Sequence, residues 1–226
     1  MKCDSKMMRL YAVTDRAWVG RQSLYSQVES ALMGGVTCVQ LREKELDSLA
    51  FLNEAVQISA LCKKYKVPFL INDNVDIAIK CRAYGVHIGQ DDMEVAQVRK
   101  RVGNNMIIGV SAHSVAEARA AVKNGADYLG AGAVFSTSTK TNTKNLSQKT
   151  LYEICAAVDV PVVAIGGIGK SNIAKLSGTG VDGVALVSAI FSASDIENEC
   201  RLLRRLSEEM VACNKLKYER GKDYDN

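Results

Sequence analysis

The clearest chemical signal in this chain is a set of polar residues at the end of one apolar run. Residues 36–41 are mostly β-branched or apolar, which is typical of a buried strand. Gln40, Arg42 and Lys44 occupy every second position, so in an extended chain their side chains project to one side. A guanidinium and an ammonium together suit a phosphate or diphosphate. The alternative is a strand that ends in a solvated loop, where these cations pair with Glu43 and Glu45.

Two aspartates follow the next apolar runs of the chain. Asp73 comes after residues 69–72, and Asp92 comes shortly after residues 86–89. The carboxyl ends of neighbouring parallel strands meet at one edge, so these two carboxylates are placed to share a hard cation. Mg²⁺ is typically bound by one or two carboxylates, water and substrate phosphate oxygens. The alternative is that each aspartate only caps the helix that follows it.

Glycines near the end of the chain indicate a second anion site. The run Ile165-Gly-Gly-Ile-Gly169 follows one strand-like segment, and Val187-Ser188 follows the next. In parallel barrels, backbone N–H groups at these two places often bind a phosphate. The glycines are also compatible with simple tight turns. Two phosphate sites at one edge imply two phosphorylated ligands.

The two histidines give a weaker indication. His87 lies inside an apolar run and is predicted to be a packed core residue, whereas His113 lies at a helix entrance and is left unassigned. No Ser/His/Asp or Cys/His spacing points to a covalent nucleophile.

These residues require an alternating strand and helix framework. Apolar strand-like runs separated by amphipathic segments occur at residues 10–14, 38–41, 69–72, 86–89, 107–111, 128–130, 162–165 and 184–187. Eight such β/α units predict an α/β fold of the (β/α)₈ TIM-barrel type. An open doubly wound sheet is the alternative, but it usually begins with a glycine-rich turn, and none follows Thr14.

Several helix starts can be located from capping residues. Ser114 with Glu117, and Ser194 with Glu197, form capping-box patterns. Asp47 is predicted to cap a helix whose buried stripe includes Leu49, Leu52, Val56 and Ala60. The polar stretch TKTNTKNLSQK before Thr150 is predicted to be a mobile functional loop.

Length and composition limit the class of protein. The 226 residues predict one domain over residues 1–213, followed by a charged, disordered tail at 214–226. A net charge of +4 with scattered basic residues and 6% aromatics favours small anionic ligands over nucleic acid. No segment has signal-peptide or membrane-span character, and the seven cysteines lack metal-ligand spacing, so a cytoplasmic protein without membrane partners is predicted. A homo-oligomer is compatible with the sequence, which does not fix the oligomeric state.

The chain resembles the thiamine-phosphate synthase family from about Leu10 to Met210. The motifs QLREK, IND, HIGQxD, GVSAH, TxTK, AIGGI and VSAI occur in the family's order. The resemblance implies an enzyme that transfers hydroxymethylpyrimidine from its diphosphate to a thiazole phosphate and releases diphosphate. It also implies one Mg²⁺ per site and a dissociative reaction through a pyrimidine cation.

The resemblance assigns roles to individual residues. The pyrimidine diphosphate site comprises Gln40, Leu41, Arg42, Glu43, Lys44, Asn72, Ser111 and Lys140. The thiazole phosphate site comprises Thr137, Ser138, Thr139, Gly167, Val187 and Ser188. Asp73 and Asp92 match the metal ligands, and Arg42, Lys44, Ser111 and Lys140 match the catalytic group.

The chain departs from the family pattern in one loop. The family often has prolines where this chain has Ala133 and Ser136, and a glycine where it has Asn145 before Leu146. The related thiazole tautomerases generally lack the full QLREK and TxTK sets and carry a histidine at the position of Ala133. Besides the tautomerase, the alternatives are a non-catalytic barrel that binds a phosphorylated ligand and a generic phosphate-binding isomerase, which requires a positioned acid and base.

Overall fold

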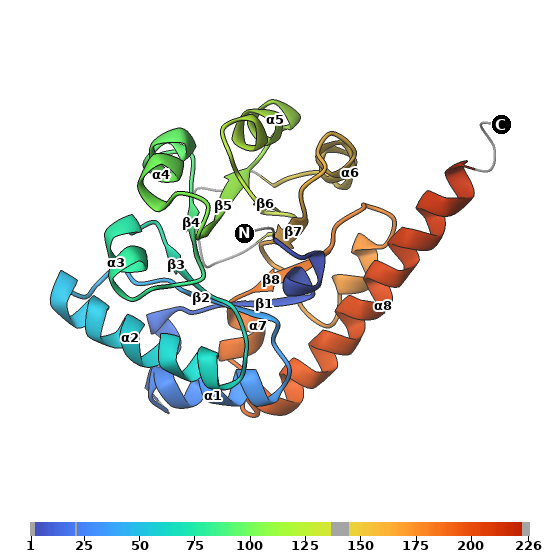
Figure 1. Ribbon diagram of the computed structural model, residues 1–226. Helices are drawn as coiled ribbons and strands as arrows, with labels where there is room; N and C mark the ends of the chain where they lie inside the picture. The colour runs from blue at the N-terminus through green and yellow to red at the C-terminus, as the bar shows by residue number, and fades with distance from the viewer. Residues whose placement is uncertain (1–2, 21, 137–144, 223–226) are drawn as a thin grey trace.

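Eight parallel strands close into a barrel in the computed structural model, which describes residues 3–20, 22–136 and 145–222. Each strand pairs with the next along the chain, and β8 pairs with β1 (Figure 1). This arrangement confirms the predicted (β/α)₈ barrel. The strands are β1 (Leu10–Val13), β2 (Cys38–Leu41), β3 (Phe69–Asn72), β4 (Gly85–Ile88), β5 (Ile107–Ala112), β6 (Tyr128–Gly132), β7 (Val162–Ile165) and β8 (Gly183–Leu186).

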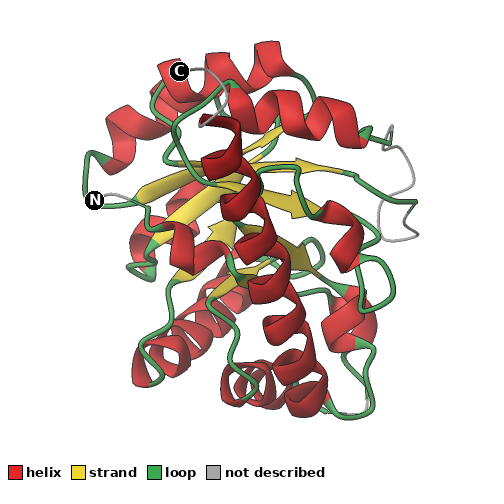
Figure 2. Ribbon diagram, turned by 90° about the vertical axis from the view of Figure 1, so that its right-hand side faces the viewer, coloured by secondary structure: helices red, strands yellow, loops and turns green. Residues whose placement is uncertain are grey.

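Helices surround the barrel, and the long α8 runs along its outer side (Figure 2). The connection from β7 to β8 contains the 3₁₀ helix η3 (Ile173–Leu176) in place of an α-helix. Two further 3₁₀ helices precede and follow β1, namely η1 (Ser5–Met8) and η2 (Arg16–Trp18). The α-helices are α1 (Leu24–Met33), α2 (Ser48–Lys64), α3 (Val75–Lys80), α4 (Val95–Val102), α5 (Val115–Lys123), α6 (Gln148–Ala156), α7 (Ser188–Phe191) and α8 (Ile196–Lys222).

The barrel has an inner and an outer apolar core. The outer core lies between strands and helices and includes Leu41, Ile71 and Ile108. The inner core fills the barrel with side chains that point inward, namely Met7, Met8, Tyr11, Val13, Cys38, Leu70, Ile107, Tyr128, Val163 and Ala185. Two of its members come from η1, which contacts β1, β7 and β8. The interior is therefore packed below the pocket described in the next subsection.

The predicted helix starts were mostly correct. Ser114 accepts a hydrogen bond from the Glu117 amide, and Asp47 accepts from the Leu49 and Ala50 amides, so both are N-caps. The cap predicted at Ser194 is wrong by one residue, because Asp195 accepts from the Asn198 amide at 3.0 Å. The carboxylate of the neighbouring residue provides this cap in place of the serine hydroxyl.

The predicted buried stripe of α2 was wrong. Leu49 is 70% exposed and Val56 is 50% exposed, whereas the buried residues of this helix are Phe51, Ala55, Ile58, Leu61 and Cys62. Two apolar stripes at helical spacing exist in this segment, and the one that carries the aromatic ring packs inward.

The predicted tail, residues 214–226, is helical as far as the structure describes it. Helix α8 continues to Lys222, because residues 214–220 lack proline and glycine and consist mainly of residues that favour helix. Asn214 is buried and donates to the Val181 carbonyl at 2.9 Å, which anchors the helix beside β8. Most of the predicted polar loop lies outside the described residues, and its last two positions begin α6. Within the described part of the chain, every helix is too short or too polar to cross a membrane.

A glycine beneath Tyr128 offers a test of the inner packing. Gly109 of β5 faces Tyr128 of β6, and a Cβ added there would lie 2.0 Å from the Tyr128 Cζ atom. We expect Gly109→Ala to lower the free energy of unfolding by about 1–3 kcal/mol, because the ring has to move within a packed interior. Urea denaturation measures this effect, with Gly20→Ala as control since its Cβ would meet nothing within 4 Å. Equal stability of the two variants would contradict the packing described.

Candidate active site

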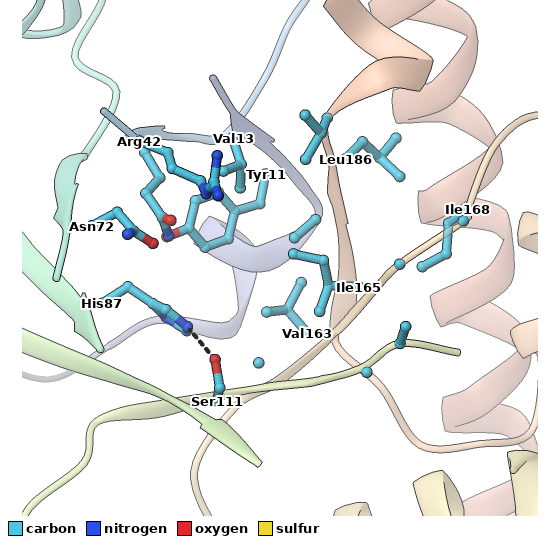
Figure 3. Close-up of a pocket in the computed structure, with 18 of the residues that line it drawn as sticks. Tyr11, Val13, Arg42, Asn72, His87, Ser111, Val163, Ile165, Ile168 and Leu186 are labelled. Atoms are coloured by element: carbon cyan, nitrogen blue, oxygen red, sulfur yellow. Dashed lines mark hydrogen bonds between the residues drawn. The ribbon is translucent and has the colours of Figure 1, made fainter. Parts of the chain in front are cut away.

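A pocket opens at the carboxyl ends of the strands, where the sequence predicts the site. One wall carries polar groups, including Gln40, Arg42, Asn72, His87 and Ser111 from β2 to β5 and the loop after β2. The other wall is apolar and includes Val163, Ile165, Ile168 and Leu186 (Figure 3). A ligand in this pocket therefore meets hydrogen-bonding groups on one side and aliphatic surface on the other.

The structure brings most of the predicted residues to this end of the barrel. Gln40, Arg42, Asn72, Ser111, Gly167, Val187 and Ser188 line the pocket. Glu43, Lys44 and Asp73 line an adjoining groove that shares Asn72 with it. Leu41 faces the outer core, so only its backbone is available to a ligand. The predicted residues Thr137, Ser138, Thr139 and Lys140 lie outside the described part of the chain.

Arg42 is held at the end of β2 by the loop after β1. The Thr14 hydroxyl accepts from the Arg42 amide at 3.0 Å, and the Asp15 carboxylate lies 3.6 Å from the Arg42 guanidinium. The Arg42 side chain retains partial exposure toward the pocket. A long contact with one carboxylate leaves its other N–H groups able to bind an anion.

Glu43 organises the loop that carries Lys44. Its Oε1 accepts from the amides of Lys44, Glu45 and Leu46 at 2.8, 2.6 and 3.1 Å. Its Oε2 accepts from Arg16 Nε at 2.7 Å. Burial alone raises the pKa of Glu43, but Arg16 and the backbone donors outweigh it and hold the pKa below its usual value. The carboxylate thus supports the loop from inside.

We expect Glu43→Gln to destabilise the protein by about 1–3 kcal/mol, because the new amide nitrogen faces Arg16. A carboxyl whose pKa is lowered on folding stabilises the fold above its unfolded pKa, near 4.5, and loses that contribution as pH falls through the folded value. The difference in melting temperature between the two proteins should therefore be largest near pH 7 and shrink below pH 4.5. Exposed Glu45→Gln is the matched control, and a pH-independent difference would contradict this role for Glu43.

Lys44, Asp73 and Asp92 form a charged cluster beside the pocket. Lys44 Nζ lies 2.5 Å from Asp73 Oδ2, and the Gly89 amide donates to Asp92 Oδ2 at 2.7 Å. Partial desolvation and the neighbouring Asp73 carboxyl raise the pKa of Asp92. Asp73 has a positive φ of 60°, a conformation that aspartate and asparagine tolerate better than most residues.

The cluster fits a hard divalent cation. Two carboxylates close enough to raise a pKa are stabilised when a cation lies between them. Among the described residues no group of three or more His, Cys, Asp or Glu side chains is arranged for a metal. Two carboxylates with the remaining ligands from water and diphosphate oxygens are nevertheless sufficient for Mg²⁺.

His87 is a pocket residue, so its prediction as a packed core residue was wrong. It is half-buried, its Nδ1 lies 2.9 Å from Tyr128 Oη, and its Nε2 lies 3.1 Å from Ser111 Oγ (Figure 3). The position of His87 along β4 identifies it as a pocket residue. His87 is the register partner of Asn72 in β3, so the two residues lie at the same level of the barrel. His113 lies at the rim and is paired with Glu117 at 3.1 Å.

The glycine loop after β7 has a conformation that requires glycine. Gly166 and Gly167 have φ of 100° and 62°, and a Cβ at Gly167 would lie 2.4 Å from the Ser136 carbonyl oxygen. Asn172 holds this loop, since its side chain accepts from the Gly169 amide and donates to the Gly167 carbonyl, both at 2.8 Å. Asn172 is not among the site residues predicted from the sequence.

The amino-acid sequence is similar to one family of known proteins. A family model described as thiamine monophosphate synthase matches residues 10–190. A thiamine-phosphate synthase of Clostridium acetobutylicum is 47% identical over 195 residues, covering 86% of this chain and 92% of the relative. One from Enterococcus faecalis is 47% identical over 208 residues, covering 92% and 98%.

A solved structure shows the same likeness. The thiamine phosphate pyrophosphorylase of Pyrococcus furiosus superposes with a TM-score of 0.85 at 36% identity, covering 92% of this chain and 98% of that one. The match to the family model extends over the strands, the charged cluster and the glycine loop. The chain therefore belongs to the thiamine monophosphate synthase family.

Proposed function

We propose that this protein is a magnesium-dependent thiamine-phosphate synthase. It would join the hydroxymethylpyrimidine group of a diphosphate to the ring nitrogen of a thiazole phosphate and release diphosphate. The observation that carries the proposal is that cationic side chains and the glycine loop meet at one end of the barrel. Arg42, Gly167, Val187 and Ser188 line one pocket, and Lys44 and Asp73 line the groove that adjoins it.

The charged cluster is suited to the leaving group. In the proposed reaction the carbon–oxygen bond to the diphosphate breaks, and its electron pair leaves with the diphosphate oxygen. Arg42 and Lys44 balance the charge that develops there, in a partly enclosed site where such charges are most effective. Bound Mg²⁺, held by Asp73 and Asp92, would neutralise further charge on the diphosphate.

The pocket walls are suited to the two rings. The polar wall, including Gln40, Asn72 and Ser111, provides hydrogen bonds for a pyrimidine. The apolar wall of Val163, Ile165 and Leu186 provides a surface for a thiazole. The thiazole nitrogen uses its lone pair to form the new carbon–nitrogen bond and becomes positively charged, so no base is needed. The protein contributes alignment and charge stabilisation.

The thiazole phosphate would bind the backbone N–H groups of the glycine loop and of Val187 and Ser188. The lining of the pocket supports this arrangement, because Gly167, Val187 and Ser188 all face the same pocket. Thr137, Ser138, Thr139 and Lys140 are assigned to the two ligands by the family resemblance alone.

The second candidate is a thiazole tautomerase, which moves a proton without joining two substrates. A histidine at position 133 would favour it, but the pocket has the buried Ala133 there. Incubation of the purified protein with both substrates and Mg²⁺, followed by mass spectrometry, tests the proposal. We expect thiamine phosphate as product. Isomerisation of the thiazole phosphate alone, with no joined product, would support the tautomerase.

A further inference from the structure

The loops after β1 and β2 carry charged residues in opposite order. Paired residues of these two strands are 27 positions apart in the chain. The same offset beyond the strand ends places Asp15 opposite Arg42 and Arg16 opposite Glu43. The Asp15 carboxylate lies 3.6 Å from the Arg42 guanidinium, and Arg16 Nη2 lies 2.5 Å from Glu43 Oε2. The strand register therefore continues into the loops as two ion pairs of reversed polarity.

Arg16 connects three elements behind the loop that carries Lys44. Its Nε donates to Glu43 Oε2 and its Nη2 donates to Glu54 Oε2 of α2, both at 2.7 Å. The Arg16 side chain is 25% exposed, and the Glu43 side chain is only 2% exposed. Within the described part of the chain, the residues that line the pocket and the adjoining groove do not include Arg16. Arg16 therefore acts on the site through its neighbours.

The path from Arg16 to the site runs through the Glu43 carboxylate. The other oxygen of this carboxylate accepts from the amides of residues 44–46, and Lys44 Nζ lies 2.5 Å from Asp73 Oδ2. Burial raises the pKa of Glu43, and Arg16 makes the largest opposing contribution. Without Arg16 the buried carboxylate would take up a proton or turn toward solvent. Both changes weaken its bonds to the loop amides.

We propose that Arg16 is a positioning residue of the diphosphate site and holds Lys44 in place through the Glu43 carboxylate. Arg16 contacts no substrate in this scheme. The inference rests on the proposed function, and it adds a residue whose loss weakens diphosphate binding while every ligand-contacting side chain remains in the protein.

Hydrogen exchange is the first test, because it reports on the loop without any ligand. We expect Arg16→Gln to speed exchange of the amides of residues 44–46 by roughly tenfold, the effect of losing one charge-assisted hydrogen bond. Arg99→Gln is the matched control. Arg99 is 22% exposed and pairs with Asp127 at 2.5 Å, just before β6 and so at the opposite end of the barrel. Equal exchange of the loop in the two variants would overturn the proposal.

Diphosphate affinity is the second test, and it does not depend on turnover. Calorimetry with inorganic diphosphate and Mg²⁺ gives a Kd for each variant. We expect Arg16→Gln to raise the Kd by roughly tenfold, and Arg16→Lys to restore most of the affinity because it keeps a cation beside Glu43. Arg99→Gln should bind like the wild type. A wild-type Kd in Arg16→Gln, or no binding to the wild-type protein, would overturn the proposal.

A double variant tests the path through Glu43. If Arg16 acts through this carboxylate, Arg16→Gln combined with Glu43→Gln should raise the Kd little more than the stronger of the two single changes. Independent, additive losses would show that Arg16 acts by another path and would overturn the proposed role. Should Arg16→Gln not fold, Glu43→Gln decides, because it breaks the same ion pair from the other side. A wild-type Kd in Glu43→Gln would then contradict the proposal.

The outcomes separate this inference from the proposed function. Diphosphate binding that depends on Arg16, in a protein that forms no thiamine phosphate, would support the inference and contradict the synthase. In an active synthase we expect Arg16→Gln to raise the KM for the pyrimidine diphosphate and to leave the KM for the thiazole phosphate within about twofold. Thiamine phosphate formation with both KM values and the diphosphate Kd unchanged in Arg16→Gln would overturn the inference alone. Circular dichroism and the melting temperature show whether each variant is folded.

Discussion

Lys44→Ala is expected to lower kcat by about 10²- to 10³-fold, the usual effect of removing one group that stabilises developing charge. Lys44 is the cation of the charged cluster nearest the two carboxylates, with Nζ 2.5 Å from Asp73 Oδ2. Its side chain is 53% exposed, so its removal takes little packing from the core. The backbone of the loop remains bound to Glu43 through the amides of residues 44–46.

The comparison for Lys44→Ala is Lys64→Ala. Lys64 also pairs with a carboxylate, 3.4 Å from Glu29, but lies at the end of α2 and is more exposed. Steady-state kinetics should show the loss only for Lys44→Ala, while the two variants melt at similar temperatures. Wild-type kinetics for Lys44→Ala would remove Lys44 from the diphosphate site.

Asp73→Asn is expected to abolish most Mg²⁺ binding and to lower turnover by roughly 10²-fold or more, as expected when one of two carboxylate ligands is lost. Asparagine keeps the size of the side chain and tolerates the positive φ of this position, so the backbone at the end of β3 is preserved. We therefore expect Asp73→Asn to lose Mg²⁺ binding and turnover but to remain folded.

Calorimetric titration of Mg²⁺ in the presence of the pyrimidine diphosphate measures the effect of Asp73→Asn separately from turnover. Asp76→Asn is the control, because Asp76 lies three residues further along, is exposed and pairs with Arg101. Undiminished Mg²⁺ affinity in Asp73→Asn, or equal losses in the two variants, would exclude Asp73 as a ligand.

The fold was predictable because short-range patterns determine it. Each predicted strand lies within one or two residues of an observed strand, since apolar runs bounded by glycine and polar residues define them. The buried face of α2 was less predictable, because the helix carries two apolar stripes and only tertiary packing selects the stripe that contains Phe51. The helical part of the predicted tail was missed because the tail was judged by its charges, although residues 214–220 also favour helix.

Part of the site could also be predicted. Gln40, Arg42, Asn72 and Asp73 lie at or just after the carboxyl ends of β2 and β3, so topology alone places them at one end of the barrel. The hydrogen-bonded chain through Tyr11, Tyr128 and His87 could not be predicted in this way, because these residues lie within apolar strands and resemble core residues in sequence. Only the closure of the barrel brings the hydroxyls and the imidazole, from β1, β6 and β4, into one chain of hydrogen bonds.

The role of Glu43 shows a further limit. The resemblance assigns it to the diphosphate site, but its side chain turns inward to Arg16 and the loop amides. A motif identifies which positions matter without indicating whether the side chain or the backbone faces the ligand. For Glu43 the structure leaves only the backbone for direct contact, and the carboxylate acts through the loop.

Diphosphate release tests the central claim most directly. The purified protein is mixed with the pyrimidine diphosphate, the thiazole phosphate and Mg²⁺, and each component is omitted in turn. We predict release at a rate that requires all three components and equals the rate of thiamine phosphate formation. An intact, folded protein that releases no diphosphate from the complete mixture would contradict the proposed synthase activity.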